Sequence, residues 1–464
     1  MRKNVLFKMI LAFVLALIMT ASVISCTTNS NNGGEPTKAP ENEPTVEPTE
    51  EPTPAPTPIE DILASLATLE YGEVKNVILY IGDGMGQNHV PATDAITGGR
   101  YDGKLAFEYL PNYAIVKTIC TEGEPDSASG GTALSTGYKG KRSQIALNNK
   151  GEEVETVVEL AKRLGKSAGV ITSESIVDAT PATFSVHSKD RKDESKIAQL
   201  QIDTSVADLI IGGGKAKYDE LFERESQYTA EYFKEHNLTY TTSWADVQAW
   251  NGEGRLIATL TDDYWFEDAK MTPTLAEMTE KSIEILSKNE KGFFLMVEGG
   301  ALDEVAHNVD VYELTQHMLA FDKAIEVGIR YAYENKDTII IVTADHNTGD
   351  LKPKDEADAY IEKHKKDNYI SNEEWCVTNA KLHCLLEAER IAAEERHPDV
   401  DYTKLPYRFT TIAHTSEEVG IWAIGPGTGD LMTTDKLASY HIGKFIGKAL
   451  SGEEFGSTDP KGIK

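Results

Sequence analysis

The stretch NVILYIG, residues 76–82, does most to decide the fold. It is short, apolar throughout and rich in β-branched residues, which predicts a strand buried on both faces. Amphipathic segments that predict helices, at 152–165 and 310–335, lie among such runs. This alternation predicts an α/β fold, a three-layer α/β/α sandwich with a mostly parallel central sheet. The other predicted strands are 167–172, 207–213, 292–298, 337–344 and 419–425.

The composition narrows the classes of function. The chain has 464 residues, of which 40% are hydrophobic, and a formal net charge of −29. So much negative charge argues against a nucleic-acid-binding module and against electrostatic attachment to anionic membranes. It is also unexpected for an enzyme that acts on anions, unless local positive charge overrides it. The sequence shows no internal repeat.

The N-terminus predicts export. Residues 1–25 combine basic residues near the start with an apolar run, and the run is short for a membrane span. They end in Val23-Ile24-Ser25-Cys26, which resembles the lipobox of bacterial lipoproteins. We therefore expect a lipoprotein-type signal peptide and a lipid on Cys26 that holds the protein at the cell membrane, outside the cytoplasm. An ordinary cleaved signal and an uncleaved anchor are the alternatives.

A tether and one large domain are expected after the signal. Residues 26–60 are rich in Pro, Thr and Glu and have almost no large apolar side chains, so they predict a semi-rigid spacer. Residues 61–464 then form the folded domain, with a polar insertion at about 351–410. Cys376 and Cys384 are close enough in sequence to form a disulfide, as export would permit, but the sequence does not decide it.

A second stretch, EPDSASGGTALSTG at 124–137, raises the question of a nucleophile. Taken alone, Ser127 is typical of a helix N-cap, because it precedes a run of small helix-compatible residues. A serine nucleophile needs an activator. The stretch has no G-x-S-x-G elbow and no nearby histidine. If Ser127 is catalytic, something other than a neighbouring base must activate it.

Acidic and imidazole side chains follow the predicted strands, at the edge where ligands gather in parallel sheets. Each of these side chains, taken alone, could have an ordinary structural role, such as a helix cap or a surface ion pair. Together, carboxylates and imidazoles suit Zn²⁺, and an oxygen-rich subset suits Mg²⁺. His414 precedes a strand, so this rule does not place it. The residues are Asp83, Asp178, Thr180, His187, Arg191, Glu298, Asp303, His307, Asp345, His346 and His414.

Six motifs then occur in the order found in alkaline phosphatases, and the sequence resembles that family over roughly 74–447. They are YIGDGMG, DSASGGTALSTG, DATPATFSVHSKDR, VEGGALDEVAH, VTADH and AHTSEE. Each is moderately specific alone, and the ordered set is highly specific. The resemblance implies a phosphomonoesterase with two Zn²⁺ and one Mg²⁺ in each active site.

The resemblance also implies roles for the individual residues. Asp303, His307 and His414 resemble the ligands of the first zinc. The second zinc would bind Asp83, Asp345 and His346. Asp83 would also reach the magnesium, which Thr180 and Glu298 complete. Ser127 resembles the nucleophile that becomes phosphorylated, and Arg191 the guanidinium that holds the phosphate. Asp178 resembles a residue near the water shell of the magnesium, and His187 matches a motif but is expected to be structural.

Two acids adjoin this site. Asp126, beside Ser127, could orient Arg191 through a charge-assisted hydrogen bond. Glu304 stands where some family members carry Lys and others His or Trp. An acid at that position, near Asp178, would weaken the attraction for phosphate, so we hypothesise that Glu304 loosens product phosphate and alters the metal preference of the third site. The alternative is a solvated surface acid.

Rival functions remain open at this point. A sulfatase is excluded, because Ser127 is followed by Ala-Ser-Gly-Gly and lacks that family's Pro and Arg. A phosphodiesterase of the same superfamily is harder to exclude, although the Arg191 motif favours small-molecule monoesters. A solute-binding lipoprotein would share the tether and the α/β pattern, but it would not require the metal-ligand set. Family members are often dimers, so a homodimer is one expectation, which the 351–410 insertion could support or block.

Overall fold

The computed structural model describes residues 56–263, 272–364, 379–459 and 462, with the backbone alone considered at 379–385. Residues Thr57–Lys464 form one compact unit, and the fold below is that of this unit. Cys26 and Cys376 lie outside the described residues, as does the side chain of Cys384. None of the described helices is both long enough and apolar enough to cross a membrane.

The centre of the domain is a nine-stranded sheet with the order β2-β13-β8-β1-β7-β3-β4-β6-β5. The strands from β8 to β5 are parallel to one another, and β13 runs antiparallel to both β8 and β2. Their bounds are β1 Asn76–Gly82, β2 Asn112–Val116, β3 Ser167–Ser175, β4 Leu209–Gly213, β5 Leu238–Thr241, β6 Arg255–Thr259, β7 Phe293–Gly299, β8 Thr338–Thr343 and β13 Val419–Ile424.

The six strands expected from apolar runs are all present in this mostly parallel sheet, which confirms the predicted fold class. Every residue of β1, β7 and β8 is buried, which explains why these runs show no polar alternation. Three strands of the sheet were not predicted: β2, β5 and β6. β2 and β5 lie at the two edges and are partly exposed, so they lack a continuous apolar signal.

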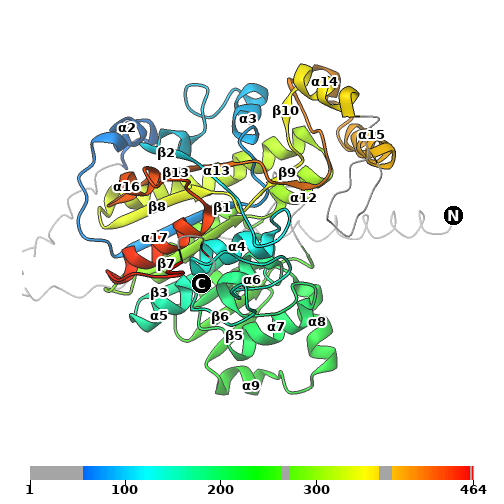
Figure 1. The fold of residues 1–464 in the computed structure, drawn as a ribbon. Coiled ribbons are helices and arrows are strands. Elements are labelled where there is room, and N and C mark those ends of the chain that lie inside the picture. The colour runs from blue at the N-terminus through cyan, green and yellow to red at the C-terminus, as the bar shows by residue number, and fades with distance from the viewer. Residues whose placement is uncertain (1–55, 264–271, 365–378, 460–461, 463–464) are drawn as a thin grey trace, which may run out of the picture. The chain divides into compact units, whose positions relative to one another are not determined.

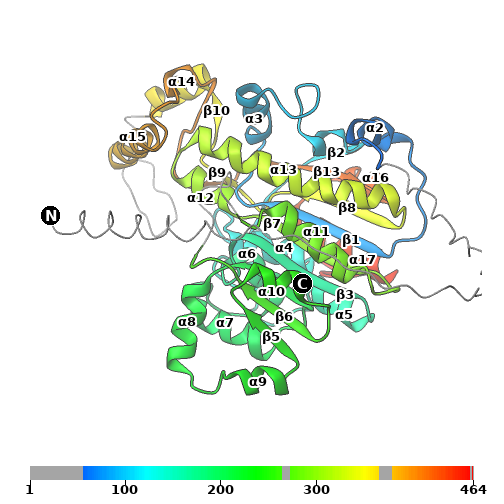
Figure 2. The same ribbon diagram turned by 180° about the vertical axis from the view of Figure 1, so that it is seen from behind.

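Helices cover both faces of the sheet, which gives the three expected layers. Helices α4, α5, α6 and α17 pack together on the face seen in Figure 1. Helices α11 and α13 pack together on the opposite face, as Figure 2 shows, and touch β3, β7 and β8. The bounds are α4 Ser127–Thr136, α5 Val157–Arg163, α6 Ala179–Ser185, α11 Leu275–Leu286, α13 Val311–Glu334 and α17 Ser439–Ser451.

The remaining elements surround this sandwich. The first described helix, α2 Ile59–Ser65, buries Ile59 and Ile62 in the hydrophobic core. The described part of region 351–410 contains mostly helices and two short strands and lies apart from the sheet in Figure 1. Its elements are β10 Lys352–Pro353, α14 Lys354–His364, α15 Asn379–Arg396, η4 Tyr402–Lys404 and β11 Tyr407–Arg408. The other elements are η1 Leu66–Thr68, α3 His89–Thr97, η2 Ala106–Tyr109, α7 Glu194–Asp203, α8 Lys215–Arg224, α9 Ala230–Glu235, α10 Trp244–Ala249, α12 Ala301–His307, β9 Asn347–Thr348, β12 His414–Thr415 and α16 Thr428–Met432.

Candidate active site

The site is built where the neighbouring strands β7, β1 and β8 end together. The parallel register sets Ile81 of β1 beside Glu298 of β7 and beside Thr343 of β8. Asp83 and Asp345, which follow β1 and β8, therefore reach the same edge as Glu298. This is the carboxyl edge at which an open parallel sheet places its ligands.

One set of ligands, which we name the strand-end cluster, is Asp83, Asp345 and His346. His346 Nε2 lies 3.3 Å from Asp83 Oδ1, 3.2 Å from Asp345 Oδ2 and 3.2 Å from Ser127 Oγ. Burial and the neighbouring carboxylates raise the pKa of Asp83 well above its usual value, and burial with Asp303 raises that of Asp345 to about 7. Burial and the nearby His414 hold the pKa of His346 well below its usual value, so its ring is a neutral ligand.

A second set, the loop cluster, is Asp303, His307 and His414. Asp303 and His307 lie one turn apart on α12, and β12 supplies His414. Asp303 Oδ2 is 3.1 Å from His307 Nε2 and 3.5 Å from His414 Nε2, and the two Nε2 atoms are 3.1 Å apart. Burial opposes ionisation of Asp303, but the facing histidines outweigh it and hold its pKa well below the usual value. Burial would lower the pKa of His307, but the neighbouring Asp303 carboxylate raises it to about 9.

A third group contains oxygen ligands alone. Thr180, near the start of α6, donates its hydroxyl to Asp83 Oδ2 at 3.2 Å. Both carboxylate oxygens of Glu298 are buried and lack a hydrogen-bond partner among the described residues. Burial and the nearby Asp178 raise the pKa of Glu298 well above its usual value.

These three groups fit cations. A buried carboxylate is costly unless a donor, a proton or a metal compensates it. The Thr172 hydroxyl favours the charged form of Glu298, but burial outweighs it. At the strand-end cluster, His346 Nε2 carries at most one proton for the three oxygens that converge on it. The two mixed groups of oxygen and imidazole nitrogen suit Zn²⁺, and the oxygen group of Asp83, Thr180 and Glu298 suits Mg²⁺.

Ser127 is the first residue of α4 and is almost fully buried. The interpretation of this serine as the N-cap is wrong: Asp126 is the cap, and its side chain accepts from the Ser129 amide at 3.0 Å. An Asp cap leaves the Ser127 hydroxyl available to face His346. The partial positive charge of the helix N-terminus then adjoins Ser127 Oγ and favours its deprotonated form.

Arg191 reaches the same helix from the segment after α6. Its guanidinium donates to Asp178 Oδ1 at 2.9 Å and lies 3.6 Å from Asp126 Oδ2. Asp126 also accepts from the Ser143 amide at 3.0 Å, so its carboxylate is fixed in place. Burial would lower the pKa of Arg191, but Asp178 and Asp126 raise it, and the group stays cationic. The expected orienting contact from Asp126 is present at ion-pair distance.

Two further residues from the motifs, Glu304 and His187, have different surroundings. Glu304 follows Asp303 on α12, and burial together with Asp303 raises its pKa to about 7. Asp178 also raises this pKa, so Glu304 lies within electrostatic reach of Asp178 and is not a solvated surface acid. His187 instead contacts the Ala146 carbonyl and the Glu159 carboxylate, each at 3.0 Å, which is the expected structural role.

Several supporting residues were missed by the sequence analysis. Thr348 donates to Asp303 Oδ1 and lies 3.3 Å from His346 Nδ1, so one hydroxyl touches both clusters. The backbone carbonyl of Ile412 lies 2.5 Å from His307 Nδ1. Gly84 has φ +65°, and a Cβ there would lie 2.4 Å from Asp303 Oδ1. Thr348 follows VTADH in the chain and could have been noticed, whereas a carbonyl contact leaves no side-chain signal.

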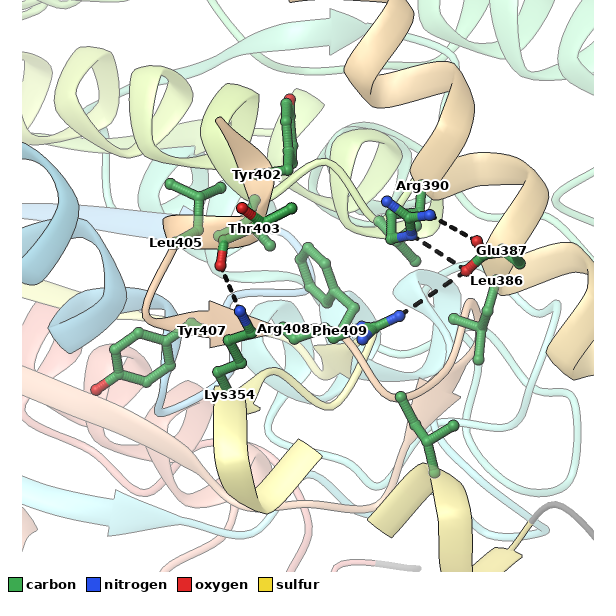
Figure 3. Close-up of a pocket in the computed structure, with 13 residues that line it drawn as sticks. Lys354, Leu386, Glu387, Arg390, Tyr402, Thr403, Leu405, Tyr407, Arg408 and Phe409 are labelled. Atoms are coloured by element: carbon green, nitrogen blue, oxygen red, sulfur yellow. Dashed lines mark hydrogen bonds and ion pairs between the residues drawn. The ribbon is translucent and has the colours of Figure 1, made fainter. Parts of the chain in front are cut away.

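A cavity lies beside this site, in the 351–410 region. Its volume is about 380 Å³, and Figure 3 shows its apolar and charged lining. Val309 and Val311 border it just after His307, and Phe409 borders it shortly before His414. Arg390 and Arg408 are both paired with Glu387 in its wall. The cavity is therefore a neighbour of the loop cluster rather than the place where the ligands converge.

The fold and the site define a class, an α/β enzyme in which cation ligands adjoin a serine and an arginine. The model of the family "Alkaline phosphatase" matches residues 74–450, and the chain belongs to the alkaline phosphatase family. The family assigns it the hydrolysis of phosphate monoesters, so it is a hydrolase.

Known relatives agree with this assignment. Alkaline phosphatase 3 of Bacillus subtilis is 29% identical over 423 residues, which cover 82% of this chain and 89% of the relative. The structure of alkaline phosphatase from the Antarctic bacterium TAB5 matches with a TM-score of 0.64 and 25% identity, over 82% of this chain and 99% of that one. The cold-active enzyme of Shewanella sp. matches with a TM-score of 0.65 and 26% identity, over 81% and 99%. A variant of the TAB5 enzyme has Mg bound in its M3 site.

Proposed function

We propose that this chain hydrolyses phosphate monoesters through a phosphoserine intermediate on Ser127. The observation that carries the proposal is the 3.2 Å contact between Ser127 Oγ and His346 Nε2, at the N-terminus of α4 and beside the strand-end cluster. In the first step Ser127 Oγ bonds to phosphorus, and the bond to the alcohol oxygen breaks. In the second step water attacks phosphorus, the Oγ–P bond breaks and inorganic phosphate leaves.

The proposed cofactors are two Zn²⁺ and one Mg²⁺. The strand-end cluster and the loop cluster would each hold a zinc, and Asp83, Thr180 and Glu298 would hold the magnesium. When bound, the zinc ions would lower the pKa of coordinated oxygens and offset the charge of the phosphate. The buried Glu298 carboxylate and the magnesium in a variant of the TAB5 enzyme support the third ion. The same ions would counter the −29 net charge locally.

Arg191 is proposed to hold the transferred phosphoryl group. Its guanidinium can donate two parallel hydrogen bonds to phosphate oxygens, a geometry that a lysine lacks. Asp126 and Asp178 fix its position from two sides. Asp126 also caps α4, so one carboxylate links the phosphate-binding guanidinium to the helix that begins with the nucleophile.

We also propose that the enzyme works outside the cytoplasm, held at the cell membrane through a lipid on Cys26. The support is the sequence of residues 1–60: a charged and apolar leader, the Val-Ile-Ser-Cys stretch and a Pro-rich tether. Labelling cells with a fatty-acid analogue tests this attachment. Loss of the label and release of the protein in Cys26→Ala are the expected results, whereas unchanged labelling would contradict the proposal.

The release of p-nitrophenol from its phosphate ester tests the activity. Turnover should require zinc and magnesium, stop with EDTA and resume when the metals return. Brief acid quenching with substrate should leave one phosphoryl group on a peptide that contains Ser127, by mass spectrometry. A diester and a sulfate ester tested in parallel should react far more slowly. Full activity without a phosphorylated serine would contradict the proposed intermediate.

A further inference from the structure

A strained link follows the loop cluster directly. His307 ends α12, and α13 begins at Val311, so residues 308–310 alone connect the two helices. Val309 has φ +48°, in the left-handed region that β-branched residues rarely occupy. Such a conformation persists only where its surroundings fix it. The backbone holds part of it, because the amides of Val309 and Asp310 donate to the Ala306 and Val305 carbonyls, each at 3.1 Å.

The side chain of Asp310 supplies the rest of this restraint. It is fully buried and caps α13 by accepting from the Glu313 amide at 3.0 Å. Arg396, at the end of α15, donates to Asp310 Oδ2 at 3.0 Å. Tyr402, at the start of η4, donates to Asp310 Oδ1 at 2.6 Å. We name Asp310, Arg396 and Tyr402 the Asp310 clasp.

The clasp joins the 351–410 region to the residues that carry zinc ligands. Arg396 and Tyr402 belong to that region, whereas Asp310 lies three residues after His307. The neighbouring His397 bridges the same two parts, with Nε2 at 3.0 Å from Glu313 Oε2 and 3.4 Å from Asp310 Oδ2. Beyond the region, the Ile412 carbonyl meets His307 Nδ1. His307 is thus supported through its ring and through the link that follows it.

We propose that Asp310 is a positioning residue for the loop cluster, and that the 351–410 region acts through the clasp to hold His307 in its metal-binding position. This inference rests on the proposed function, because it takes the loop cluster as a zinc site. The physical reason is that different parts of the structure hold the two clusters in place. Strand ends fix the strand-end cluster, whereas α12 is a helix of seven residues that ends in a strained turn. Contacts from residues that are not metal ligands themselves therefore determine how accurately His307 is positioned.

The test compares zinc binding by variants of the full chain after removal of the metals. Tyr402→Phe deletes one oxygen, and Arg396→Gln deletes the charge. Competition with a chromophoric chelator should show that each variant binds the more weakly held zinc about 10-fold less tightly, while the tightly held zinc is unchanged. Cobalt(II) placed in the loop cluster should show an altered visible spectrum. Arg396→Lys, which keeps a cation, should recover part of the affinity.

Arg390→Gln is the matched control. Arg390 lies earlier on α15 and pairs with Glu387 and Glu394, and no contact with Asp310 occurs in the described structure. It should leave the affinity and the spectrum unchanged. A merely structural clasp would lower the unfolding temperature of Tyr402→Phe while both metal readouts stay as in the unmodified protein. That result would overturn the inference.

A separate measurement keeps the two proposals distinguishable. If the unmodified chain bound no zinc and turned over no ester, the proposed function would fail. Hydrogen exchange of the metal-free chain would then still test the clasp. Tyr402→Phe should speed exchange in residues 301–310 several-fold and leave the amides around Asp345 unchanged. Equal exchange in both segments would show that the clasp does not position α12.

Discussion

The two ligand clusters differ in what holds them. The strand-end cluster follows β1 and β8 at the centre of the sheet, and its His346 side chain has no exposed surface. The loop cluster depends on a short helix and on β12 beyond the 351–410 region, and the His307 side chain is 32% exposed. Rigid strands preorganise the first, whereas the second depends on contacts far apart in the sequence. We therefore expect the strand-end cluster to bind its ion more tightly than the loop cluster does. We also expect substitutions in the strand-end cluster to lower activity more.

The largest effect is expected from Ser127→Ala, which separates chemistry from metal binding. Turnover of p-nitrophenyl phosphate should fall by about four orders of magnitude or more, because no other group described at this position can take the phosphoryl group. Metal content, measured by elemental analysis, should be unchanged at both clusters. Ser135→Ala in the same helix is the control, since Ser135 Oγ donates to the Thr132 carbonyl inside α4. Substantial turnover by Ser127→Ala would contradict the role of this serine.

The second-largest effect is expected from replacing one candidate ligand in each cluster. Asp345→Asn should lower turnover about 100-fold or more, because it removes a fully buried ligand beside Ser127. His307→Gln should lower turnover only about 10-fold and should weaken only the more readily lost zinc, because an amide oxygen can replace the imidazole at a partly exposed site. Elemental analysis during dialysis against a chelator should show this order. An equal loss from both variants would contradict the difference between the clusters.

The same contrast explains how much the sequence could predict. The strand-end residues followed from apolar runs such as 76–82 and 337–344, because strand ends share one edge of the sheet. Asp303 and His307 also follow a predicted strand, 292–298, whereas His414 precedes one and was placed by resemblance alone, because no local pattern brings it to α12. His307 is supported by the Ile412 carbonyl, 105 residues away, and through Asp310 by Arg396 and Tyr402, which are 86 and 92 residues from Asp310. Periodicity does not reveal such tertiary contacts. The N-cap of α4 was misassigned by one residue, because Asp126 and Ser127 are both good caps.

A smaller effect, about 10-fold per pH unit, should distinguish the clusters by their protons. Metal ligands must lose their protons before they bind, so acidification weakens binding. In the metal-free chain the pKa of His307 is about 9, so the loop cluster should lose zinc affinity as the pH falls below that value. In the strand-end cluster, protons on Asp345, with a pKa of about 7, and on Asp83, whose pKa burial raises well above its usual value, compete with the metal.

Zinc affinity measured from pH 9 to pH 6, in the unmodified chain and in His307→Gln, checks this order. The part of the slope between pH 9 and pH 7 that belongs to the weaker site should disappear in the variant. A slope that persists without His307 would assign the proton to another ligand.

The smallest effect concerns Glu304, which follows Asp303 on α12 and lies within electrostatic reach of Asp178. Its pKa of about 7 makes it mostly neutral at pH 6 and mostly negative at pH 8. Negative charge there repels phosphate, so Glu304→Gln should bind inorganic phosphate about 3-fold to 10-fold more tightly at pH 8. At pH 6 the variant and the unmodified enzyme should differ little. The inhibition constant of phosphate at the two pH values measures this, and magnesium affinity measured alongside tests the effect on the third site.

Glu231→Gln, on the exposed side of α9, changes the net charge equally and should leave both constants unchanged. An effect of equal size in the two variants would indicate that long-range charge, and not the position of Glu304, sets the affinity. An effect of Glu304→Gln that is the same at pH 6 and pH 8 would show that the ionisation of Glu304 is not its cause. The role of Glu304 in loosening product phosphate is supported only if phosphate binds more tightly at pH 8 and not at pH 6. The tighter binding must also occur in Glu304→Gln and not in Glu231→Gln. Such a result would tie the acid at this position to the loop cluster rather than to the strand-end cluster, because Glu304 shares α12 with Asp303 and His307.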